Sequence, residues 1–167
     1  MTYQATGAEI KRADKLHAML LFDFIVVHVF VFVLALGLIK SSYVPLALMP
    51  VISIILLSYV IITAARGAKH EPSWFVRCHM SLAAKRARLF LLLFLITGTF
   101  TAIMFFGGPQ LGISKIASYS LAFGIGQLPF MVALLALVVM EYDASHQCKT
   151  GRVPVAAQAL HPVPEEV

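Results

Sequence analysis

One acidic residue and one histidine lie deep inside the first apolar run of this 167-residue chain. Asp23 is the only acidic residue well inside such a run, and a carboxylate in hydrocarbon is expected to handle a proton or ion unless a neighbour holds it. Tyr59 and Arg88 fall at a similar depth and are its expected structural partners. His28 follows five residues later, about 140° around an ideal helix, so we expect Asp23 and His28 to face different directions.

A layer of polar side chains is expected near the middle of the membrane. Counted inward from the outer ends of the apolar runs, one polar residue per run lies roughly 15–18 Å deep. Interhelical hydrogen bonds in membranes contribute about 0.6–2 kcal/mol each, so the layer would set helix register or hold a proton or small ligand. We expect the first pairing between His28 and Gln127. The layer consists of His28, Ser53, Thr97 and Gln127.

Several histidines and cysteines near one end of the runs raise the question of a haem or metal site. Bis-histidine haem needs two axial ligands at one depth, and His17 has candidate partners beyond the membrane boundary, whereas His28 has none within the chain. The cysteines lack the paired CxxC or HxxxH spacing of a transition-metal site. We therefore expect no cofactor, with one haem b as the alternative. The candidate ligands are His17, His79, His146, Cys78 and Cys148.

Four apolar runs must position these residues, and each is near the ~20 residues that cross a ~30 Å hydrocarbon core. They cover residues 16–39, 43–64, 89–106 and 116–140. A chain that is 60% hydrophobic and 13% charged has too little polar surface for a soluble domain. We expect an all-α polytopic membrane protein, with four transmembrane helices in two hairpins that form one bundle over residues 1–149.

The basic residues predict the orientation of this bundle. Eleven of the thirteen Lys and Arg residues lie before the first run, between the second and third, or after the fourth; Lys40 and Lys115 are the exceptions. Short cytoplasmic loops retain basic residues, so both termini should be cytoplasmic. The expected location is the cell inner or plasma membrane. Anionic lipid headgroups account for the net charge of +5, so we expect no nucleic acid.

Two helices are expected to extend into the cytoplasm. Thr6 followed by Glu9 is a capping-box pattern, so the first helix should begin about two turns before the bilayer. Pro72 and Ser73 mark the start of another helix that continues into the third run. From Thr150 onward, prolines and an acidic end predict a mobile tail over residues 150–167.

The fourth run contains small residues and a proline that predict close helix packing. Gly124 and Gly126 would let a neighbouring backbone approach, and Pro129 would free a carbonyl group. The stripe expected to face the bundle interior consists of Ser120, Gly124, Gln127 and Met131.

The signatures of soluble enzymes are absent: there is no P-loop, GxGxxG, GxSxG or HExxH pattern. We therefore expect a small membrane protein without its own catalytic chemistry, acting as an accessory, assembly or stabilising subunit. Its partners would be the bilayer and another membrane protein or a second copy. Two alternatives remain: a b-type haem or quinone-linked electron carrier, and a small proton- or ion-coupled transporter that uses Asp23 and His28.

Overall fold

The chain is all-helical in the part that the computed structural model describes, residues 3–38 and 40–162 without the side chain of Ala68. No strand occurs in this part. Four helical stretches are long and apolar enough to cross a membrane, which confirms the predicted all-helical class and the number of candidate spans. They are Gly7–Leu38, Val44–Gly67, Trp74–Leu111 and Lys115–Lys149.

The helices belong to two compact units. Unit 1 contains the chain up to Arg88 and again from Val138, and unit 2 is Leu89–Leu137. Helices α4 (Trp74–Ala102) and α6 (Leu128–Lys149) each contribute residues to both units. The polar residues that dominate the site described below all belong to unit 1.

The first helical stretch changes geometry along its length. It begins as α1 (Gly7–Phe22), continues as the π-helix η1 (Asp23–Val31) and ends as α2 (Phe32–Leu38). The predicted capping box is confirmed: Glu9 N donates to Thr6 Oγ1 (3.3 Å), and Thr6 N donates to Glu9 Oε2 (2.8 Å). Both orphan amides at this helix start therefore have acceptors.

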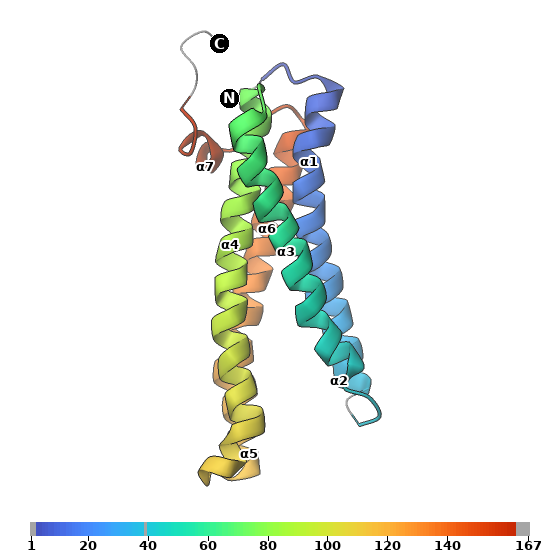
Figure 1. Cartoon of the computed structure of the whole chain (residues 1–167), viewed down its shortest axis with the longest axis vertical. Coiled ribbons are helices and arrows are strands. Elements are labelled where there is room, and N and C mark those ends of the chain that lie inside the picture. Colours follow the sequence, from blue (N-terminus) through green and yellow to red (C-terminus); the bar gives the residue numbers. More distant parts are fainter. Residues whose placement is uncertain (1–2, 39, 163–167) are drawn as a thin grey trace. The chain divides into compact units, whose positions relative to one another are not determined.

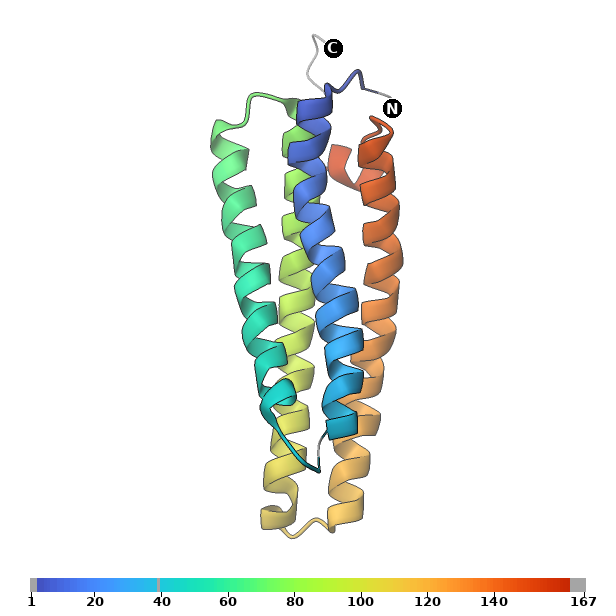
Figure 2. The same cartoon turned by 90° about the vertical axis from the view of Figure 1, so that its right-hand side faces the viewer.

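Helix α3 (Val44–His70) packs along this first stretch, in contact with α1, η1 and α2 (Figures 1 and 2). Its start agrees with the predicted run, but it continues six residues past Ala64. Buried side chains recur on α3 at Leu57, Val60 and Ala64, the spacing of one helix face.

The two ends of the described chain meet in unit 1. Tyr3 N donates to Gly151 O (2.8 Å), and Gly151 has a φ of 68°. A Cβ at Gly151 would lie 2.8 Å from Tyr3 O, so the turn needs glycine for both reasons. The short helix α7 (Val155–Gln158) follows, with Ala157 buried. Residues 150–162 of the predicted mobile tail thus make defined contacts, and residues 163–167 lie outside the described chain.

Unit 2 joins the second part of α4 to the first part of α6. Between them lie η2 (Ile103–Gly107), the 3₁₀ turn η3 (Gly108–Leu111), α5 (Lys115–Leu121) and the π-helix η4 (Ala122–Gln127). Two hydroxyl groups bond across to carbonyl oxygens: Thr101 to Ala122 (3.3 Å), and Ser118 to Met104.

The predicted interior stripe of the fourth run is wrong by about two residues. Ser120 is exposed, and the other three members of that stripe are only half-buried. The prediction used the 3.6-residue turn of an α-helix, whereas the buried positions are four residues apart through the wider turn of η4. They are Ser118, Ala122, Gly126 and Phe130.

Candidate functional site

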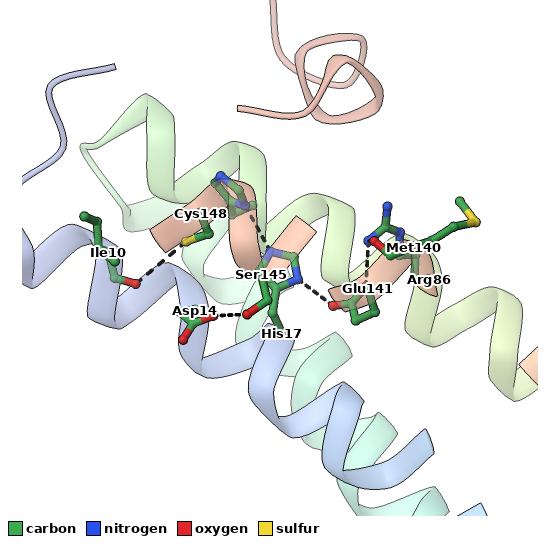
Figure 3. Close-up of polar contacts among 9 residues, drawn as sticks. Ile10, Asp14, His17, Arg86, Met140, Glu141, Ser145 and Cys148 are labelled. Carbon is green, nitrogen blue, oxygen red and sulfur yellow. Dashed lines mark hydrogen bonds and ion pairs between the residues drawn. The ribbon is translucent and has the colours of Figure 1, made fainter. Parts of the chain in front are cut away.

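A continuous series of buried polar contacts links three helices near the chain ends of unit 1 (Figure 3). His17 Nδ1 lies 2.5 Å from Glu141 Oε1, and His17 Nε2 lies 3.0 Å from His79 Nδ1. His79 Nε2 in turn donates to the carbonyl oxygen of Arg152 (3.0 Å). All three side chains are completely buried. We call Glu141, His17 and His79 the histidine chain.

On α4 and on α6, the buried polar residues of this site lie on one face of the helix. On α4, His79 and Arg86 are seven residues apart, which is two helical turns. On α6, Glu141, Ser145 and Cys148 recur at the four- and seven-residue spacing of a single stripe, and all three are buried. The side chains of the α6 stripe therefore contact α1, and Glu141 and His79 both reach His17.

Arg86 holds the other side of Glu141. Its Nη1 atom lies 2.8 Å from Glu141 Oε2 and 2.9 Å from Met140 O. The arginine side chain is 9% exposed and that of the glutamate 0%, so this is a buried ion pair. Removal of either partner would be strongly destabilising, because it leaves the other as a buried charge without solvent.

A second set of contacts flanks the histidine chain on the side of the helix termini (Figure 3). Asp14 accepts from Ser145 Oγ (2.6 Å) and pairs with Lys149 Nζ (3.4 Å). Cys148 Sγ donates to Ile10 O (3.8 Å). These contacts bind α1 to the last turns of α6.

A deeper polar cluster, the Asp23 site, consists of Asp23, Ser53 and His28. Ser53 Oγ donates to Asp23 Oδ2 (3.0 Å), and His28 Nδ1 donates to the Asp23 carbonyl oxygen (3.1 Å). The same ring nitrogen is 3.8 Å from Asp23 Oδ2. All three residues are buried, and Asp23 Oδ1 has no hydrogen-bond partner in the described chain.

The contact between Asp23 and His28 depends on the π-helical geometry of η1. We expected these residues to face different directions, and this expectation is wrong. In a π-helix, residue i bonds to residue i+5, so side chains five residues apart lie over one another. Single π-helical turns recur at functional sites in other proteins, and here the turn begins at the buried acid itself.

No protein-family model, curated protein or solved structure matches this chain. Its function must therefore be inferred from the chemistry of the histidine chain and the Asp23 site.

The histidine chain does not have the spacing of the bis-histidine haem considered for His17 and His79. The two rings do come together, but the axial nitrogens of a bis-histidine haem lie on opposite sides of the iron, about 4 Å apart, since each bond is about 2 Å. Here the facing nitrogens are 3.0 Å apart, and the two outer ones are bonded to Glu141 and Arg152. Ligation would require the loss of at least one of these contacts.

The other candidate ligands lie elsewhere. His146 is exposed. Cys78 and Cys148 are both buried and free, and each donates to a backbone carbonyl, Cys78 to His161 O at 4.0 Å. Within the described residues, no three His, Cys, Asp or Glu side chains form a group that could hold a metal ion.

The expected partners of Asp23 contact other groups. The Tyr59 hydroxyl accepts from Lys15 Nζ (3.2 Å), and Arg88 is exposed. Of the predicted polar layer, His28 and Ser53 belong to unit 1 and meet at Asp23. Thr97 and Gln127 belong to unit 2, where Thr97 Oγ1 donates to Leu93 O (2.7 Å) of its own helix. A layer across all four helices stays a prediction.

Sequence reasoning missed Glu141 and Arg86, neither of which is among its candidate site residues. A usable signal was present: Glu141, Ser145 and Cys148 share one helical stripe, as do His79 and Arg86. These stripes lie on the helical extensions, outside the apolar runs in which polar residues were expected to meet.

Proposed function

We propose that this chain moves protons across a membrane, and that Asp23 and His28 bind the proton. The observation that supports this most directly is the Asp23 carboxyl group, which is 0% exposed and bonded through one oxygen to Ser53. An ionised carboxylate at such a position has a large desolvation cost and a neutral one does not, so the group is suited to taking up and releasing a proton.

The donor set of the Asp23 site favours a proton over a metal cation. Hard divalent cations take six or more oxygen ligands. Among the described residues, the side-chain contacts of Asp23 are one hydroxyl, from Ser53, and one ring nitrogen, from His28. A proton needs a single basic atom, and a carboxylate or imidazole supplies it.

The orientation we propose follows from charge. The helices form two hairpins in the cell inner or plasma membrane, with both termini in the cytoplasm, because short cytoplasmic loops retain Lys and Arg. The histidine chain would then lie at the cytoplasmic end. Asp23 would lie about 9 Å deeper, since it follows His17 by six residues of helix.

Proton flux in reconstituted vesicles tests the proposal. The purified chain is placed in liposomes that contain a pH-sensitive dye, and a potassium gradient with valinomycin imposes a membrane potential. We expect proton entry faster than in protein-free vesicles, and at least tenfold slower entry with Asp23→Asn, because an amide cannot carry the proton.

Asp143→Asn is the matched control, since Asp143 is an exposed carboxylate on α6 that accepts from Gln147 (2.7 Å). This variant should keep the wild-type rate. Flux no faster than in empty liposomes, or an unchanged rate with Asp23→Asn, would contradict the proposal.

A second candidate is the accessory or assembly subunit of a larger membrane complex. Unit 2 supports it with large apolar side chains that are exposed along its helices, a surface that either lipid or a partner helix can cover. A stoichiometric membrane protein that co-purifies in mild detergent is the expected result, and isolation as a single species would count against it. The most exposed of these residues are Phe106, Leu111, Ile116, Ile125, Leu128, Val132 and Leu135.

A further inference from the structure

The histidine chain holds a countable number of protons, because each of its three contacts needs one hydrogen. The Arg152 carbonyl oxygen can only accept, so His79 Nε2 must carry a hydrogen. One hydrogen must lie between His79 Nδ1 and His17 Nε2, and another between His17 Nδ1 and Glu141. Glu141, His17 and His79 therefore hold three protons together.

Three protons are one more than a carboxylate and two neutral imidazoles hold. The additional proton has three positions: the Glu141 carboxyl group, the second ring nitrogen of His17, or that of His79. Each arrangement keeps all three hydrogen bonds and gives the three groups a summed charge of zero. The proton can therefore shift along the chain without breaking a contact, which is the behaviour of an imidazole proton shuttle.

We propose that the histidine chain is a binding site for one exchangeable proton, and that this proton holds the C-terminal segment, residues 152–162, against α4. The site is separate from Asp23, and the inference does not require that the protein transports anything. The segment takes part because its first residue, Arg152, supplies the terminal acceptor of the chain.

The charges around the histidine chain favour one position of the exchangeable proton. Arg86 lies 2.8 Å from Glu141, so the carboxylate stays ionised and the exchangeable proton lies on the pair His17 and His79. Asp14 and Lys149 pair with each other (3.4 Å), so their charges offset. The Arg152 side chain is exposed. The charged and titratable neighbours are Asp14 on α1, Cys78 and Arg86 on α4, Cys148 and Lys149 on α6, and Arg152.

The C-terminal segment contacts α4 on both sides of His79. Trp74 Nε1 donates to the carbonyl oxygens of His161 and Pro162, at 3.1 Å each. Ser81 Oγ lies 2.8 Å from His161 Nε2. Trp74 is the only tryptophan of the chain and is 4% exposed, so its fluorescence reports whether this segment is in place.

Loss of the exchangeable proton to water or buffer base weakens this docking. Two protons then remain for three contacts, and the charge-assisted bond from His17 to Glu141 keeps one of them. The other must serve both contacts of His79, so either its bond to His17 or its bond to Arg152 is lost. Two lone pairs then face each other in a buried site, which is unfavourable.

Gain of a proton has a different result. With four protons both imidazoles are charged, and the N–H groups of His17 and His79 oppose each other. The bond from His79 to Arg152 keeps its hydrogen and becomes charge-assisted. Docking should therefore persist as the pH falls and weaken as the pH rises.

Trp74 emission against pH, measured on the full chain in lipid nanodiscs, tests the proposal. The expected result is a red shift of the emission maximum as the pH rises, because water reaches the indole when residues 161 and 162 leave it. The shift should follow a single-proton transition and reverse when the pH is lowered.

Two substitutions at His79 separate this mechanism from a general loosening of the fold. His79→Gln places an amide N–H, which does not titrate, near Arg152 O, so the red shift should disappear and the emission should stay blue at high pH. His79→Phe has no donor, so its emission should be red-shifted at every pH.

His161→Gln is the control, because the carbonyl oxygen of His161 accepts from Trp74 and its ring lies 2.8 Å from Ser81 Oγ. This variant should keep the wild-type transition. A transition that persists in His79→Gln would overturn the proposal, and so would a transition that is lost in His161→Gln. So would emission in the wild type that does not change with pH.

Discussion

Glu141 lies between a guanidinium and an imidazole, and its removal should be costly. Glu141→Ala leaves Arg86 buried without a counter-ion and should lower the free energy of unfolding by about 3–5 kcal/mol. Unfolding in mixed detergent–SDS micelles measures this change. A double variant, Arg86→Met with Glu141→Leu, should recover most of the loss because no buried charge remains unpaired.

An exposed ion pair of the same unit gives the comparison for this prediction. Arg12 Nη2 lies 3.2 Å from Glu71 Oε1, with the arginine side chain 49% exposed. Arg12→Ala should cost less than about 1 kcal/mol, because water solvates both groups when the pair is broken. Equal losses for Arg12→Ala and Glu141→Ala would show that the buried pair has no special role.

At the scale of elements, Gly126 and not Gly124 is the member of the small-residue cluster that a neighbouring helix approaches closely. A Cβ at Gly126 would overlap the Thr101 hydroxyl and come within 3.2 Å of Phe100, whereas a Cβ at Gly124 meets nothing within 4 Å. Gly126→Ala should therefore destabilise the protein by about 1–3 kcal/mol through overpacking.

Gly124→Ala is the matched control two residues away in the same π-helix. It should be neutral or stabilising by up to about 1 kcal/mol, because alanine has the higher helix propensity. Thermal unfolding in detergent, followed by circular dichroism, measures both variants. Similar losses at the two positions would contradict the contact between Gly126 and Thr101.

At the scale of the whole molecule, topology is the prediction to test. In a background with Cys78→Ala and Cys148→Ala, single cysteines replace Lys40, Lys115 or Lys69, all of which are exposed. A membrane-impermeant maleimide added to spheroplasts should label positions 40 and 115 and leave position 69 unlabelled until the membrane is opened. The reverse pattern would place both termini outside.

The sequence by itself determined the class of the protein and the start of its helices. Four runs of apolar residues can only be buried in lipid or in one another, so the membrane-spanning helices were predictable from length and composition. The cap at Thr6 and the start of α4 at Trp74 were predictable because these signals are local in the chain.

Only the tertiary structure decided which polar residues meet. The pairing of Asp23 with His28 depends on a π-helical turn, and periodicity based on 3.6 residues per turn places them apart. The pairing of His17 with Glu141 joins residues 124 positions apart. Contacts of this kind depend on which helix faces are packed together, and that choice is made by the fit of whole helices rather than by any local pattern.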